Sequence, residues 1–169
     1  RHYVEYKGKE MLKKLLIMLI FISINLFAWD SATYYFDEGV RDYNNKNYKQ
    51  AIKNYEKSAK LGNKKAMYNL GLIYSGGIGV EKDYEKAFSW YEQASNKGDF
   101  NATYNLAVIY DDGLGVQKNS KKAVELYTKS ANLGNANAMY NLANKYYAGD
   151  ELDKNIDEAI KWYEKSANL

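Results

Sequence analysis

Apolar residues recur along most of the chain at the three- and four-residue spacing of amphipathic helices. In one stretch Ala66, Leu70 and Ile73 fall on a single helical face, and in the next Ala87 and Tyr91 do the same. This spacing is typical of short helices that bury one side. The pattern predicts helices arranged in pairs from about residue 32 onward, and no β-strands.

The helical pattern repeats with a fixed period of 36 residues. "IYSGGIGV" at 73–80 returns as "IYDDGLGV" at 109–116, and "YNL" begins at 68, 104 and 140. Three further sets of residues follow the same offset: Ala51, Ala87, Ala123 and Ala159; Tyr55, Tyr91, Tyr127 and Tyr163; Gly62, Gly98 and Gly134. A period of this length indicates stacked structural repeats, because one unit cannot bury its apolar face alone.

The glycine-rich stretch at 74–80 resembles a phosphate-binding loop at first sight, but it lacks the spacing of a dinucleotide fingerprint or a P-loop. Its recurrence one repeat later indicates a tight connection between two helices. We expect Gly79 and Gly115 to adopt equivalent conformations, at least one of them with a positive φ, which glycine adopts at little cost. Asp83, Asn119 and Asn155 stand where helix N-caps belong.

The second unit, "AMYNLGLIYSGGIGVEKDYEKAFSWYEQASNKGD", resembles the Sel-one-like repeat (SLR), a relative of the tetratricopeptide repeat (TPR). The matching residues are Ala66, Leu70, Gly71, Tyr74, Gly77, Gly79, Val80, Asp83, Lys86, Ala87, Trp90, Tyr91, Ala94 and Gly98. The third unit keeps most of these. The fourth has Glu151 and Leu152 in place of the second glycine and the valine, so its turn is expected to depart from the pattern.

The resemblance implies an all-α fold, a right-handed α-solenoid of stacked antiparallel helix pairs. About four units are expected, at 32–62, 63–98, 99–134 and 135–169, within a repeat domain at 29–169. The first unit resembles a tetratricopeptide repeat more closely, because Gly39 and Ala51 are nearer in sequence than Gly71 and Ala87. The fold indicates function only weakly, since such repeats act as adaptors with unrelated partners.

The stretch from Met11 to Ala28 has the pattern of a secretory signal peptide. Lys13 and Lys14 precede an apolar run that ends at Phe27. The alternative is a retained anchor, although the run is shorter than the roughly 20 residues that span a bilayer. We expect a periplasmic or secreted protein that touches a membrane only through this leader, if the leader is not cleaved. Residues 1–10 are assigned to neither leader nor repeat.

Composition removes most catalytic and metal chemistry from the repeat domain. The chain has no cysteine, and its only histidine is His2. Residues 29–169 therefore lack the groups for a cysteine nucleophile, a Ser-His-Asp triad or a metal site ligated by cysteine or histidine. We expect no cofactor. This part of the chain has 19 basic and 19 acidic residues, so nucleic acid is a poor candidate partner.

In related helix-pair repeats the first helix of each unit lines a concave groove, and this geometry supplies the candidate partner-binding residues. They are Tyr68, Asn69, Leu72, Tyr104, Asn105, Val108, Tyr140, Asn141 and Asn144. Aromatic faces and amides could bind a peptide backbone. The alternative is that the Tyr-Asn pairs support packing between helices.

Two functions from different classes remain open. The first is a secreted or periplasmic adaptor that binds a protein or peptide in the groove. The second is a cell-envelope enzyme of hydrolase or β-lactamase type, in which Asp111 and Asp112 could serve acid–base chemistry. Neighbouring residues on a helix point in different directions, so the two carboxylates would make a poor pair. They could instead influence partner choice, or be ordinary solvated charges.

Overall fold

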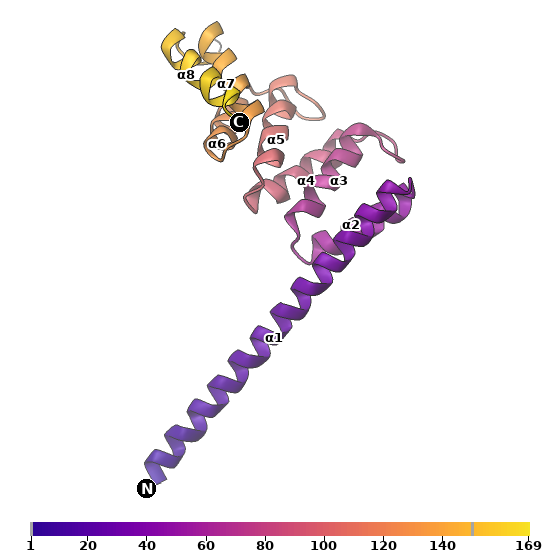
Figure 1. Ribbon diagram of the computed structural model, residues 1–169, viewed down its shortest axis with the longest axis vertical. Helices are drawn as coiled ribbons and strands as arrows, with labels where there is room; N and C mark the ends of the chain where they lie inside the picture. Colours follow the sequence, from indigo (N-terminus) through magenta and orange to yellow (C-terminus); the bar gives the residue numbers. More distant parts are fainter. Residues whose placement is uncertain (1, 150) are drawn as a thin grey trace.

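The computed structural model describes residues 2–149 and 151–169, with the side chains of residues 2–9, 25, 26 and 28–30 left aside. Over these ranges the chain forms eight helices and no strands: α1 (His2–Asn44), α2 (Tyr48–Lys60), α3 (Lys64–Gly76), α4 (Tyr84–Asn96), α5 (Phe100–Asp112), α6 (Ser120–Asn132), α7 (Ala136–Ala148) and α8 (Ile156–Ala167). They pack as four antiparallel pairs, and each helix contacts the next along the chain (Figure 1). The predicted all-α solenoid of stacked helix pairs is confirmed.

The connection between paired helices is built as the sequence predicted. Gly77 ends α3 in the left-handed conformation, with its backbone N–H donating to the Ile73 carbonyl. Asp83 caps α4, because its carboxylate accepts from the Lys86 backbone N–H at 2.9 Å. Asn119 and Asn155 cap α6 and α8 in the same way.

Gly79 and Gly115 adopt φ angles of 70° and 68°, as predicted. Each also lies against the start of the second helix of the preceding unit. A Cβ atom on Gly115 would approach Tyr84 Cβ to 2.8 Å, and one on Gly79 would collide with Tyr48. These glycines therefore satisfy two needs at once, a left-handed backbone and close packing between units.

The first and fourth units vary this connection without disturbing the stack. In the fourth, Glu151 takes a φ of 62° at the position of Gly79 and Gly115, so the left-handed turn persists although the glycine is replaced. In the first, only the three residues 45–47 separate α1 from α2, and Lys46 carries the positive φ of 61°. The shorter turn predicted for the first unit is confirmed.

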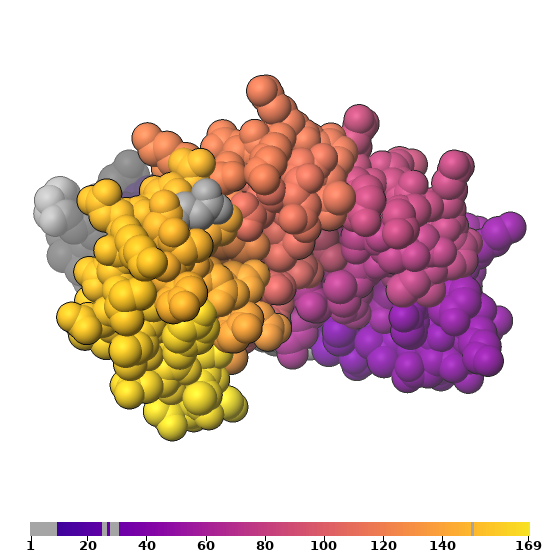
Figure 2. All heavy atoms as spheres, turned by 90° about the horizontal axis from the view of Figure 1, so that it is seen from above, coloured from indigo at the N-terminus to yellow at the C-terminus, as the bar shows by residue number. Residues whose placement is uncertain are grey.

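The core combines alanines with larger apolar side chains, among them Tyr91, Leu70 and Leu142. Ala51, Ala87 and Ala123 are fully buried. Gly71 allows the Tyr91 ring to lie directly on α3, where a Cβ atom would collide with it. The buried residues form two clusters, one through the first three units and one through the last two, so the hydrophobic core extends along the whole stack. Figure 2 shows the units in chain order across the molecule, from purple at the first to yellow at the last.

Helix α1 runs without interruption from the leader into the first unit, although the sequence predicted a separate helix from about residue 32. No glycine or proline occurs between Gly8 and Gly39, so nothing in this stretch stops the helix. Its N-terminal part projects away from the stack (Figure 1), and the apolar side chains from Met11 to Ile24 are exposed there. Among the described residues no helix combines the length and apolarity needed to cross a membrane.

Candidate partner-binding groove

The tyrosines of the three "YNL" segments lie against the second helix of their own unit. The Tyr68 ring contacts the Tyr91 ring at a centroid distance of 6.1 Å, and the Tyr104 ring contacts the Tyr127 ring at 6.0 Å. Tyr140 contacts Tyr163 at 5.5 Å. These rings therefore contribute to packing within each unit, while part of each ring stays accessible.

The asparagines of the same segments reach toward the preceding unit. Burial raises the pKa of the Tyr91 hydroxyl to about 12, and hydrogen bonds with Ser75 and Asn105 oppose that rise. Asn141 opposes the rise in the pKa of Tyr127 in the same way. Asn69 does so for Tyr55. Each amide thus lies beside a tyrosine hydroxyl of the preceding unit, and this arrangement favours the packing role that the sequence left open.

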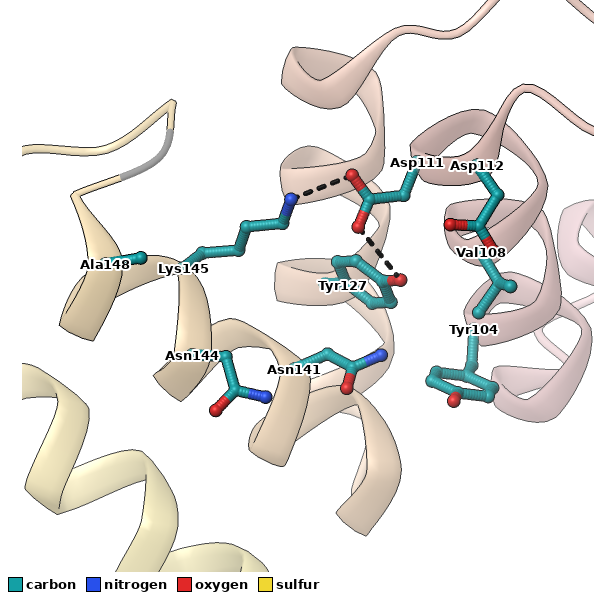
Figure 3. Close-up of a pocket in the computed structure, with 9 residues that line it drawn as sticks. All are labelled: Tyr104, Val108, Asp111, Asp112, Tyr127, Asn141, Asn144, Lys145 and Ala148. Carbon is teal, nitrogen blue, oxygen red and sulfur yellow. Dashed lines mark hydrogen bonds and ion pairs between the residues drawn. The ribbon is translucent and has the colours of Figure 1, made fainter.

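A pocket of about 420 Å³ lies between α5, α6 and α7, where the third and fourth units meet (Figure 3). We call it the polar pocket. Its lining residues are Tyr104, Val108, Asp111, Asp112, Tyr127, Asn141, Asn144, Lys145 and Ala148. Four of the predicted groove residues therefore lie together in it: Tyr104, Val108, Asn141 and Asn144.

An ion pair closes one side of the polar pocket. Lys145 Nζ lies 2.8 Å from Asp111 Oδ1, and only 13% and 20% of the two side chains are exposed. The Tyr127 hydroxyl donates to the same carboxylate at 3.5 Å. Burial raises the pKa of Tyr127 well above its ordinary value, and the negative charges of Asp111 and Asp112 act in the same direction.

A second pocket of about 250 Å³ lies between α1, α2 and α3, where the first two units meet. We call it the apolar pocket. Its lining residues are Val40, Tyr43, Tyr55, Asn69, Leu72 and Ile73. It contains two predicted groove residues, Asn69 and Leu72. The other three, Tyr68, Asn105 and Tyr140, lie on the same helices but line neither pocket.

The sequence did not single out Lys145, Tyr127 or Tyr43 as pocket residues. A signal for Lys145 was present, because the repeat places Ile73 and Ile109 at its position. A charged residue at a position that is otherwise apolar indicates a local change in the environment.

The two carboxylates offered as a catalytic pair do not act together. Asp111 turns toward Lys145 and Tyr127, whereas the Asp112 side chain is exposed and points away from both of them (Figure 3). An ion-paired carboxylate beside an exposed one lacks the shared environment of an acid–base pair. The geometry gives no support to the enzyme hypothesis.

Stacked helix pairs with a grooved face place this protein among the helical-repeat scaffolds. Sel1 repeats, the Sel-one-like repeats of the sequence analysis, match residues 31–63, 64–99, 101–135 and 136–169. The chain therefore belongs to the Sel1 repeat family. Proteins built from this repeat generally mediate protein–protein interactions.

Solved structures of Sel1 repeat proteins have the same fold. A Sel1 repeat protein from Oxalobacter formigenes is 29% identical over 82% of this chain and 58% of its own, with a TM-score of 0.78. A protective antigen of uropathogenic Escherichia coli that displays an SLR fold is 30% identical over 86% of this chain and 32% of its own, with a TM-score of 0.79. This chain thus spans between about a third and three fifths of those two proteins.

Helicobacter pylori cysteine rich protein B shares the fold at 24% identity, over 69% of this chain and 89% of its own, with a TM-score of 0.53. No curated protein matches the chain.

Proposed function

We propose that this protein is an adaptor that holds an extended segment of a partner protein along the groove formed by α1, α3, α5 and α7. The observation that carries the proposal is the recurrence of a pocket at equivalent places, between the first and second units and between the third and fourth. Two pockets on one regular framework suit a ligand that extends along the stack.

The groove offers the groups that an extended peptide needs. Peptide backbone requires donors and acceptors, and half-buried amides supply both, while exposed tyrosine edges cover apolar side chains. The helix pairs are fixed by a left-handed turn in every unit, so little order has to be gained on binding. A preorganised surface of this kind loses less entropy when it associates.

We also propose that the adaptor works outside the cytoplasm, in the periplasm or as a secreted protein. Two lysines followed by an apolar run support this, because that order is typical of a secretory leader. Expression of the full chain in a bacterium, followed by mass measurement of the periplasmic product, tests the proposal. Loss of the residues up to about Ala28 is expected, and an intact chain retained in the cytoplasm would contradict it.

A photoreactive amino acid placed in the groove tests the adaptor proposal. We would place it at Val108 in one variant and at Leu72 in another, with exposed Lys121 on α6 as the control position. The expected result is that both groove positions crosslink to the same partner protein in envelope extract and that the control does not. Equal labelling from all three positions, or different proteins from the two groove positions, would contradict binding along the groove.

A further inference from the structure

The two pockets are copies of one site. Every residue that lines the apolar pocket has a repeat counterpart that lines the polar pocket. The counterparts on α2 and α3 lie 72 residues later, and those on α1 lie 68 residues later because the first turn is shorter. The pairs are Val40 and Val108, Tyr43 and Asp111, Tyr55 and Tyr127, Asn69 and Asn141, Leu72 and Asn144, Ile73 and Lys145.

Half of the positions are kept and half are changed in chemistry. The tyrosine, the asparagine and the valine are the same in both pockets. The remaining three positions carry Tyr43, Leu72 and Ile73 at one end, and an aspartate, an asparagine and a lysine at the other. The groove therefore keeps its framework while its lining changes from apolar to charged along the stack.

The polar pocket carries excess negative charge. Lys145 lies against Asp111, so these two charges largely neutralise each other. Asp112 also lines the pocket, is exposed, and makes no hydrogen bond or ion pair with another described residue. Two carboxylates and one ammonium leave a negative charge, and a cation of the partner would be attracted to it.

We infer that the groove binds its peptide in a single orientation, with an apolar side chain in the apolar pocket and a lysine or arginine side chain in the polar pocket, opposite Asp112. This inference rests on the proposed function and adds the chemistry of the partner. Reversing the peptide would place a charged group against Leu72 and Ile73, where no carboxylate lines the pocket. Desolvation without a counter-charge opposes that arrangement.

Binding of designed peptides to the full-length chain, kept in mild detergent because of the exposed apolar part of α1, tests the inference. The fluorescent peptides have one leucine and one lysine separated by uncharged spacers of increasing length. Matched sets carry glutamine or glutamate instead of lysine. We expect the lysine peptides to bind most tightly and the glutamate peptides least tightly, with a difference that shrinks as salt is added.

Two variants and a control connect the preference to the pockets. Asp112→Asn should weaken the binding of the lysine peptides by about two- to fivefold, as expected for the loss of an exposed ion pair. The affinity for the glutamine peptides should not change. Leu72→Asn should weaken all leucine peptides and leave the lysine preference intact. Glu81→Gln removes the same charge from an exposed loop outside both pockets and should change neither.

The possible outcomes distinguish the inference about peptide orientation from the adaptor proposal on which it rests. Peptides that bind in the groove without a lysine preference, or whose preference survives Asp112→Asn, would overturn the inference and leave the adaptor proposal standing. Binding that Leu72→Asn and a blocking Val108→Lys variant both leave unchanged would overturn the adaptor proposal as well. Failure of every peptide to bind would count against both.

Discussion

The two ends of the groove show how a repeat protein can vary its chemistry without changing its fold. At the apolar end, Ile73 is buried beside Leu72 and Tyr43. At the polar end, Lys145 replaces the isoleucine, and Asp111 stands where it can neutralise the lysine. The helices that line the two ends correspond although the first turn is shorter, because the turns that connect them involve other residues. Framework and recognition are therefore carried by separate positions in each unit.

The largest loss of stability is expected when the lysine of the polar end is introduced at the equivalent position of the apolar end. Ile73→Lys places an ammonium where Tyr43 stands instead of a carboxylate, so the charge would be buried without a partner. We expect a loss of about 3–5 kcal/mol in the free energy of unfolding. Urea unfolding measures it, with the smaller but apolar Ile73→Val as the control at about 1 kcal/mol. A loss no larger than that of the valine variant would show that the apolar end tolerates charge.

The amides shared by both ends should contribute to stability rather than to recognition alone. Replacing Asn69, Asn105 and Asn141 together by alanine removes three amides that lie beside tyrosine hydroxyls of the preceding units. At roughly 0.5–1.5 kcal/mol for each hydrogen bond, the expected loss is about 2–4 kcal/mol.

The matched control replaces three exposed asparagines, Asn96, Asn132 and Asn137. Thermal unfolding of the two triple variants, together with peptide titration of the folded protein, measures both effects. An unchanged melting temperature with weakened binding would assign the amides to the ligand instead.

Replacing the ion pair of the polar end by uncharged residues should preserve stability only when Lys145 and Asp111 are replaced together. Lys145→Ile leaves Asp111 half-buried without its counter-charge, and we expect a loss of about 1–3 kcal/mol. Adding Asp111→Ser gives the pair that the second and third units carry as Ser75 and Ile109, so most of the loss should be recovered. A double-mutant cycle measures this coupling. Additive losses would mean that the ion pair does not link α5 and α7.

A smaller gain is expected at the turn of the fourth unit. Glu151 holds a left-handed backbone that side chains disfavour, whereas Gly79 and Gly115 hold it at little cost. Glu151→Gly should therefore stabilise the protein by about 0.5–1 kcal/mol, a rise of roughly 2–4 °C in Tm. Glu151→Ala keeps a Cβ atom and should give no such gain. Equal melting temperatures for the two variants would contradict the strain.

The separation between framework positions and recognition positions also explains which features the sequence could predict. The N-caps at Asp83, Asn119 and Asn155 and the φ of Gly79 depend on local chemistry, and the sequence predicted them correctly. The left-handed Glu151 went against local preference, because the surrounding stack imposes the turn on it. The pairing of Lys145 with Asp111 joins residues 34 apart through the stacking of α7 on α5. Only their departure from the repeat marked these two positions.

The candidate groove was predicted in part for a similar reason. Repeat geometry placed Val108, Asn141 and Asn144 on the grooved face, and the structure gathers them in one pocket. It could not predict that Asn141 meets a tyrosine hydroxyl, because that contact depends on how closely the units pack. Helix α1 was missed as a single element, since the change from leader to repeat suggested a boundary that no helix-breaking residue provides.

The most direct test is to map where each end of a bound peptide lies. A leucine–lysine peptide carries a photoreactive group at one end or at the other, and mass spectrometry identifies the labelled helices of the full-length chain. Binding along the groove predicts that the leucine end labels α1 and α3 and that the lysine end labels α5 and α7. If both ends label the same pocket, or label α4 and α8, which line neither pocket, the two pockets do not form one binding groove.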